Sequence, residues 1–135
     1  MSVADATLAV QAAIIASLRA DAAVAALVAA RVHDAPPQGV AFPYVSLGPE
    51  RGEPWEGTTM EGWSLAWQID TWSRVQGGVE ARRIIAAIAD ALHRETLTVA
   101  GAQFVAADLT FQTTLRDPDG ITTHGVQSFR FLTHT

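Results

Sequence analysis

Hydrophobic and polar residues alternate along the last third of the chain, a pattern that predicts a β-hairpin. From Val105 onward the odd positions are mainly apolar and the even positions are polar, as in a strand with one buried and one solvated face. Residues 117–120, Asp-Pro-Asp-Gly, have the composition of a tight turn. The chain then returns as a second strand over residues 121–133. The apolar positions of the first strand are Val105, Ala107, Leu109, Phe111 and Leu115.

The same period of two predicts a central strand over residues 63–72, whose aromatic and β-branched residues suit a half-buried sheet surface. Trp72 falls on the other, more polar face of this strand. A shorter strand is predicted over residues 42–48, where Pro43 indicates a position at or beside a sheet edge. The face expected to be buried in the central strand consists of Trp63, Leu65, Trp67, Ile69 and Thr71.

A helical spacing of apolar residues predicts two main helices, over residues 4–19 and 78–93. A short helix between them, over residues 22–30, has Asp21 as its predicted N-cap. Strands joined by short turns pair as antiparallel neighbours, and the helices must cover one face of the sheet. The expected fold is α+β: a single domain of residues 1–135, with a four-stranded, mainly antiparallel sheet and two main helices on one face.

Charge and composition argue against several classes of function. The 135 residues carry a formal charge of −5, and the nine basic residues are all arginine, dispersed apart from Arg82 and Arg83. Because affinity for nucleic acid grows with clustered basic residues, we do not expect sequence-specific DNA binding. The absence of cysteine excludes disulfides and thiolate metal sites. The alanine-rich residues 6–30 are interrupted by polar side chains and do not predict a membrane span.

The side chains that could carry chemistry do not form a catalytic or metal-binding motif. No two histidines have the spacing of a helical metal site, and the sequence contains no phosphate-binding loop or nucleophile motif. His33 and Asp34 could form half of a metal or general-base pair, but a polar step between helix and loop is the simpler interpretation. Asp117 and Asp119 are typical turn residues rather than calcium ligands. We therefore expect no catalytic residues, no cofactor and no enzymatic activity.

Residues 49–62 are rich in glycine, proline and acidic residues and are predicted to be the least structured part of the chain. Trp55 is unusual in such a polar segment. It either folds back onto the core or serves as a partner-binding anchor, since tryptophan is enriched at interface hot spots.

The edges of the predicted sheet are a second feature with two interpretations. An open sheet has two unpaired edges, which a protein must block or use. Neither outer strand of the predicted sheet carries a lysine. Either loops cover these edges, or the edges mediate assembly into a ring of identical subunits.

Several segments carry, in their order, a resemblance to a known family. They are residues 31–34 (Arg-Val-His-Asp), residues 42–48 (Phe-Pro-Tyr-Val-Ser-Leu-Gly), residues 70–73 (Asp-Thr-Trp-Ser), the helix over residues 80–92, residues 116–120 (Arg-Asp-Pro-Asp-Gly) and residues 124–126 (His-Gly-Val). Together with the alanine-rich first helix, this order resembles the small tail-terminator, or tail-completion, proteins of long-tailed phages and of bacterial gene transfer agents. The resemblance covers essentially the whole chain.

The resemblance implies a structural role in a virion tail. Proteins of this kind form a ring, expected to be a hexamer, that caps the head-proximal end of the tail tube and stops its polymerisation. The implied partners are further copies of the chain, the major tail tube protein and the head connector or stopper protein, while DNA passes through the ring without specific binding. Assembly is expected in the cytoplasm of the bacterial host, with no membrane contact.

The candidate contact residues come from three segments. The predicted loop over residues 50–62 would dock on the tube or the connector, and the polar face of the central strand would form the subunit interface. The turn of the last hairpin completes the set. In chain order the candidates are Glu53, Trp55, Glu56, Trp72, Asp117 and Asp119.

Two alternatives stay open. The stopper that seals DNA in the head is a neighbouring head-to-tail connector of similar size. A small α+β enzyme or ligand-binding domain would instead need a deep pocket between sheet and helices, with convergent polar groups. A tightly packed inner face would argue against such a pocket; its expected members are Leu65, Trp67, Ile69, Leu109 and Phe111.

Overall fold

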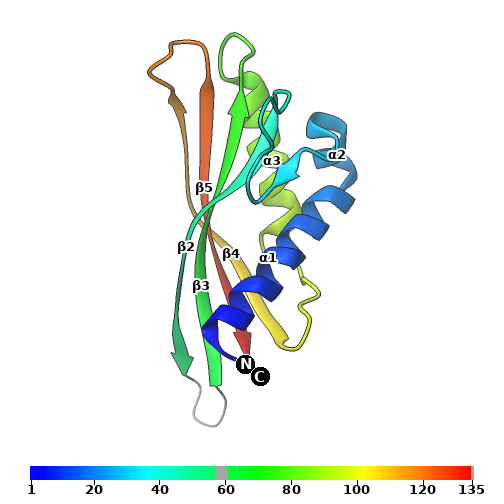
Figure 1. Cartoon of the computed structure of the whole chain (residues 1–135), viewed down its shortest axis with the longest axis vertical. Coiled ribbons are helices and arrows are strands. Elements are labelled where there is room, and N and C mark those ends of the chain that lie inside the picture. Colours follow the sequence, from blue (N-terminus) through cyan, green and yellow to red (C-terminus); the bar gives the residue numbers. More distant parts are fainter. Residues whose placement is uncertain (57–60, 135) are drawn as a thin grey trace.

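Three helices pack on one face of a long, twisted sheet in the computed structural model, which describes residues 1–56 and 61–134 (Figure 1). The helices are α1 (Val3–Ala20), α2 (Ala22–Val28) and α3 (Val79–Leu92). The strands are β1 (Val32–His33), β2 (Tyr44–Glu56), β3 (Glu61–Ser73), β4 (Gln103–Arg116) and β5 (Thr123–His134). The predicted α+β class and all three predicted helices are confirmed.

The sheet has five strands in the order β1-β2-β3-β5-β4. β1 runs parallel to β2, whereas all other neighbouring pairs are antiparallel. The prediction of a four-stranded sheet is wrong because β1 contains only Val32 and His33, too few residues to show a period. Val32 pairs with Val45 and is fully buried. His33 therefore belongs to a strand and not to the predicted polar step.

β2 extends well beyond the predicted strand over residues 42–48. Residues 50–56, predicted to be unstructured, instead pair with β3 after a register shift. Glycine and proline are compatible with this strand because it is an edge strand, covered by β1 only at its start, and a missing amide donor on a free edge breaks no ladder hydrogen bond. The rest of the predicted loop, residues 57–60, and the side chain of Glu56 lie outside the described residues.

Local side-chain caps define the first two helices. The Ser2 hydroxyl accepts a hydrogen bond from the Asp5 backbone N–H (3.1 Å), and the Asp5 carboxylate accepts one from the Ser2 backbone N–H (2.9 Å), which completes a capping box. Asp21 accepts a hydrogen bond from the backbone N–H of Val24 (3.0 Å) and caps α2, as predicted.

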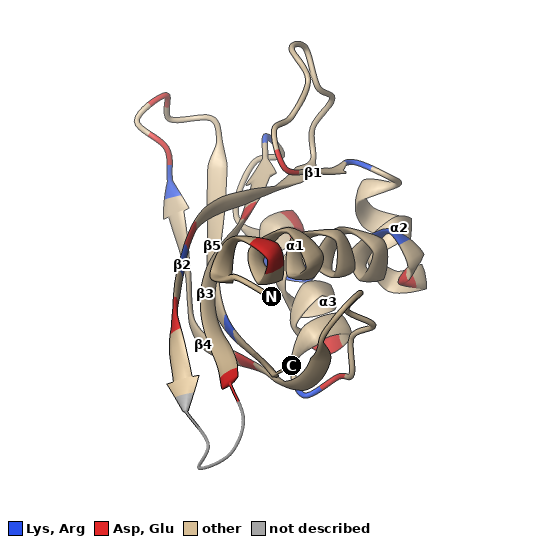
Figure 2. Ribbon diagram, turned by 60° about the horizontal axis from the view of Figure 1, so that its bottom comes forward, with Lys and Arg blue, Asp and Glu red and all other residues tan. Residues whose placement is uncertain are grey.

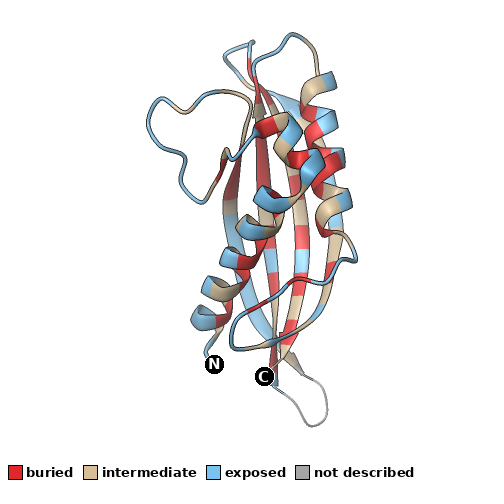
Figure 3. Ribbon diagram, turned by 90° about the vertical axis from the view of Figure 1, so that its right-hand side faces the viewer, coloured by how far each residue is buried: buried red, intermediate tan, exposed pale blue. Residues whose placement is uncertain are grey.

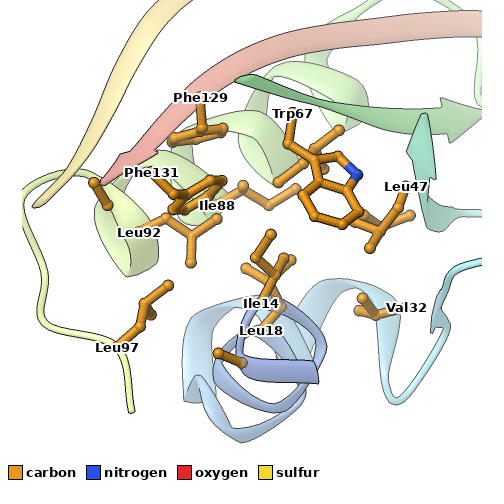
Figure 4. Close-up of a cluster of buried hydrophobic side chains, with 14 of the residues drawn as sticks. Ile14, Leu18, Val32, Leu47, Trp67, Ile88, Leu92, Leu97, Phe129 and Phe131 are labelled. Carbon is orange, nitrogen blue, oxygen red and sulfur yellow. The ribbon is translucent and has the colours of Figure 1, made fainter. Parts of the chain in front are cut away.

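α1 is long and apolar enough to cross a membrane by length and composition alone. Its apolar stripe is nevertheless used inside the protein, since Val10, Ile14 and Leu18 are fully buried in the hydrophobic core (Figure 4). The apolar stripe of α1 therefore has a packing role within the fold.

The core lies between the sheet and the helices, where burial is concentrated (Figure 3). Leu65, Trp67 and Ile69 of β3 are buried on this side, as predicted. They pack beside Phe129 and Phe131 of β5, whose rings stack with centroids 6.0 Å apart (Figure 4). This dense packing argues against a ligand pocket in the centre of the layer between sheet and helices.

Two bulges interrupt the regular alternation of β4. The second leaves Thr110 without a cross-strand partner, and one extra residue moves all later side chains to the opposite face. Leu109 therefore points to the helices, whereas Phe111 and Leu115 point away from them and are 56% and 51% exposed. The predicted burial of the odd positions is wrong for these two residues and for Val105, the extra residue of the first bulge, which is 40% exposed.

Candidate interaction surface

The face of the sheet opposite the helices is not covered by any other element of the described chain, and we call it the open face (Figures 1 and 2). Side chains alternate between the two faces along each strand. Trp72 follows the fully buried Thr71 and precedes the fully buried Ser73. It therefore lies on the open face, as its sequence pattern predicts.

An aromatic row crosses the open face near one end of the sheet. Tyr44 of β2, Trp72 of β3 and His124 of β5 lie opposite one another in neighbouring strands. The imidazole stacks on the indole with ring centroids 3.8 Å apart, and the Tyr44 ring follows at 6.3 Å. Phe42 extends the row, with the Arg74 guanidinium 4.1 Å from its ring centroid. Burial raises the pKa of Tyr44, partly offset by the charge of Arg74, so the Tyr44 phenol stays neutral.

Polar side chains fix the orientation of this row. The Trp72 Nε1–H donates a hydrogen bond to the Ser46 hydroxyl (3.0 Å). His124 Nε2 lies 2.7 Å from a carboxylate oxygen of Asp70, which also accepts a hydrogen bond from the Gln68 side chain (2.9 Å). The indole and the imidazole are thus both held by polar partners, and the row forms a surface suited to contact with another protein.

The predicted contact residues of β2 lie far from the aromatic row. The Trp55 ring covers the backbone of the opposite strand, since its Cε3 is 2.6 Å from the position that a Cβ on Gly62 would take. Glu53 is exposed and forms a salt bridge with Arg51 (3.5 Å). About ten residues of β3, or roughly 33 Å, separate Trp55 from Trp72. The structure therefore does not bring the two tryptophans into one site.

The turn predicted between the last two strands is confirmed. The Asp119 carboxylate accepts hydrogen bonds from the backbone N–H groups of Ile121 and Thr122, each 2.8 Å, and from the Thr122 hydroxyl at 2.6 Å. These bonds, led by that of the Thr122 hydroxyl, lower the pKa of Asp119 to about 2. Asp117 contributes backbone hydrogen bonds to Thr122 and Gly120. The acidic tip of this hairpin (Figure 2) thus has a defined conformation, in which the Asp119 carboxylate is already hydrogen-bonded within the turn.

The contact of His124 with Asp70 and the part played by Tyr44 are not visible in the sequence. In the sequence, His124 shares its parity with Val126 and Arg130, which indicates a surface position. Its stacking, however, depends on the register between strands that are distant in sequence. Within residues 1–56 and 61–134, no three His, Cys, Asp or Glu side chains are arranged to hold a metal ion.

Both outer strands of the sheet are covered over only part of their length. β1 covers the first residues of β2 alone. On β4, the backbone N–H of Arg94 donates to the Ala107 carbonyl (2.7 Å). The Leu109 N–H donates to Nδ1 of His93 (2.9 Å). In the described chain, the backbone of residues 111–116 is bonded to β5 and to no other segment. Each side of the sheet therefore ends in a stretch of unpaired strand.

Comparisons with known proteins agree on one kind of relative. The family model described as Tail completion protein gp17 matches residues 12–134. The tail completion protein gp17 of Bacillus phage SPP1 is 29% identical over 101 residues, which is 75% of each chain. A chain of the solved virion of a native gene transfer agent particle matches with a TM-score of 0.89 and 30% identity, over 96% of this chain and 98% of that one. The solved structure of the SPP1 gp17 protein matches with a TM-score of 0.65 and 26% identity, over 96% and 91%.

Proposed function

Because this chain belongs to the tail completion protein gp17 family, it is a structural component of a virion tail and not an enzyme, and we propose that it terminates that tail. In this proposal identical copies form a ring, a hexamer, on the head-proximal end of the tail tube. The ring stops further polymerisation of the major tail tube protein. It also presents a platform to the head connector or stopper protein.

The observation that carries this proposal is the pair of half-free sheet edges. The unpaired backbone N–H and C=O groups of an edge strand can pair with other chains and promote aggregation unless they are covered. A subunit with a free stretch on each side of its sheet can repeat head-to-tail, and such a contact closes into a ring when the rotation between neighbours allows it. The likeness to a chain of the gene transfer agent virion supports a place in such a particle.

Contacts with other proteins are assigned to the two ends of the open face. The arm formed by β2 and β3, with Glu53, Trp55 and Glu56, would dock on the tube or the connector. The aromatic row around Trp72 would take part in contacts between subunits through its flat surface, because the indole is already held within the chain. The hairpin tip with Asp117 and Asp119 lies at the same end as the row. A partner would contact this tip in the conformation that the turn already has.

The charges on the open face support passage of DNA without specific binding. Two of its arginines are matched with carboxylates, Arg51 with Glu53 at 3.5 Å and Arg130 with Asp108 at 3.6 Å. Matched guanidinium groups offer little uncompensated charge to phosphate groups, and the chain as a whole carries a charge of −5.

Electron microscopy of particles made without this gene tests the proposal, with plasmid complementation as the control. Overlong or uncapped tubes, detached from filled heads, are expected if the protein terminates the tail. Tails of normal length beside heads that have leaked their DNA would identify a stopper instead. Particles that are intact and infectious or transfer-competent would rule out both roles.

A further inference from the structure

We infer that neighbouring copies meet through the free half of β4 and the free stretch of β2, and that Arg82 and Arg116 of one copy bind Glu50 of the next. The occupant of this surface is therefore a second copy of the chain. The inference rests on the ring proposed above and names the residues that would close it.

A groove runs along the free half of β4, between that strand and α3. It consists of two neighbouring hollows of about 290 and 210 Å³. Arg82 and Thr114 line both hollows, and Arg116 lines the second. Both arginines are exposed, and neither forms a salt bridge with another described residue. The groove therefore offers two guanidinium groups that no carboxylate in the described chain neutralises.

Part of the wall of the groove is polar as well. Gln112, which lines the first hollow, accepts a hydrogen bond from the fully buried Gln127 (3.4 Å). Gln127 also donates to the carbonyl of Ile85 (2.9 Å), and its own Oε1 has no partner among the described residues. Polar groups in the wall and two arginines without a carboxylate partner favour a carboxylate at this place in the groove.

The opposite edge of the same sheet carries the matching charge. Glu50 is exposed on the free stretch of β2 and forms no salt bridge within the described residues. It pairs with the buried Trp67, so its side chain lies on the helix side of the sheet. The groove beside α3 is on that side too. When one sheet continues into the next, the two faces are preserved, and Glu50 then lies on the same side as Arg82 of the adjacent copy.

The directions of the strands fit a cyclic arrangement. Following the antiparallel pairs across the sheet, β2 and β4 run in opposite directions (Figure 1). Copies related by rotation about one axis keep the same orientation along it. The β2 strand of one copy therefore lies antiparallel to the β4 strand of its neighbour, which is a favourable pairing for edge strands.

The contact also requires a shift along the strands between neighbouring copies, and the size of this shift is compatible with a closed sheet. Through its cross-strand partners, Glu50 is level with Phe129 of β5, whereas Thr114 is level with Gly125. Four residues correspond to a shift of about 13 Å between copies. Over four long strands spaced about 4.8 Å apart, or roughly 19 Å, this shift gives a strand tilt of about 35°. Closed sheets have tilts of about 35–45°.

Exposed apolar side chains lie along the same free half of β4 and in the turn that follows it. Phe111 and Leu115 of β4 and Ile121 of the following turn are among the large hydrophobic residues that remain exposed. Burying them against the next copy would supply apolar contact area, while the charged groups set the pairing and its direction.

Cysteine cross-linking in assembled particles tests the contact, because the natural chain contains no cysteine. Glu50→Cys and Thr114→Cys, combined in the full-length chain as the sole copy in the producing strain, should give on oxidation a ladder of covalent multimers that ends at the size of the ring. Each single-cysteine variant should stay monomeric. Dimers from a single variant would reveal a two-fold contact between like surfaces and overturn the inference. A double variant that terminates tails normally without cross-linking would overturn it as well, while leaving tail termination intact.

Charge reversal gives an independent readout that does not depend on cysteine geometry. Arg82→Glu and Glu50→Arg should each reduce the amount of the chain in purified tails by on the order of tenfold, and the two together should restore it. Arg83→Glu and Asp90→Arg, exposed on α3 outside the groove, are matched controls with the same changes of charge. Thermal unfolding of each purified variant identifies any loss of folding. Folded single variants that assemble normally, or a double variant that is not restored, would contradict the contact.

Discussion

The imidazole of His124 lies flat against the indole of Trp72, with ring centroids 3.8 Å apart and an angle of 11° between the planes. Asp70 holds the imidazole at 2.7 Å, and Ser46 accepts the indole hydrogen bond. Because these groups come from three strands, the stack depends on the register of β2, β3 and β5. The same rings are also part of the candidate interaction surface, and substitutions can separate the two roles.

Removing the Trp72 ring should destabilise the fold. We expect Trp72→Ala to lower the free energy of unfolding by about 2–3 kcal/mol, since it loses the stack with His124 and the bond to Ser46. Trp72→Phe keeps an aromatic ring and should lose about 1 kcal/mol. Urea denaturation of the purified chain measures both. A loss below about 0.5 kcal/mol for Trp72→Ala would show that the indole contributes little to stability and is available to a partner.

Trp55→Ala should weaken assembly while leaving the fold intact, because the indole lies at the end of the arm and outside the main core. The amount of the chain in purified tails reports assembly, and circular dichroism reports folding. Trp67→Ala, at a buried position of the neighbouring strand, is the control that should unfold or strongly destabilise the chain. If Trp55→Ala also unfolds the chain, Trp55 is a core residue and its assignment as a docking residue is wrong.

The lowered pKa of Asp119 predicts a defined dependence of stability on pH. Its folded value of about 2 lies below the usual 3.8. The carboxylate therefore stabilises the fold above the usual value, and this contribution is lost as the pH falls from there toward about 2. The difference in stability between the natural chain and Asp119→Asn should shrink over that interval. An unchanged difference in acid-unfolding curves would show that the bonds to Thr122 do not favour the ionised form.

The bulge at Thr110 predicts unequal tolerance of two phenylalanines. Phe111→Ser should change the free energy of unfolding by no more than about 0.5 kcal/mol, because the ring is exposed. Phe129→Ala, fully buried on the neighbouring strand, should cost about 3–5 kcal/mol. Similar losses of stability at both positions would show that Phe111 is a core residue and that β4 has no bulge at Thr110.

The hydroxyl of Thr71 is buried and has no hydrogen-bond partner among the described residues. Thr71→Val replaces it with a methyl group of similar shape and should raise the free energy of unfolding by about 1 kcal/mol. Thermal unfolding measures the change, and Thr133→Val, at a second hydroxyl of the same kind, repeats the test in β5. Destabilisation in both variants would mean that these hydroxyls are hydrogen-bonded in solution.

Much of the fold follows from local patterns. The helices, β3 and the last turn are visible in the sequence because each has a regular period, a cap or a strong turn composition. β1 is not visible because Val32 gains its strand character only from pairing with Val45. The second half of β2 is hidden by its prolines and glycines, which resemble a loop unless the strand is known to lie at an edge.

The candidate surface is only partly predictable for a similar reason. Alternation places Trp72 and His124 on the correct face, yet their stacking requires two strands separated by α3 and β4 to align residue by residue. The exposed position of Phe111 is hidden because a bulge is a property of a strand pair, and a strictly alternating sequence gives no sign of it. The proposed charge match between Arg82 and Glu50 depends on the order of strands in the sheet.

The order of strands has a further consequence, for the time course of folding. β5 is the last strand in the chain but lies inside the sheet, between β3 and β4, so Ile69 must find Gln127 across most of the second half of the sequence. Contacts this distant in sequence form slowly. Until residues 123–134 have left the ribosome, Trp67 and its neighbours have no β5 to pair with, and the core cannot close. The two strand edges proposed to mediate assembly can therefore be aligned only after synthesis of β5, and we expect folding of the subunit to precede its addition to the tail.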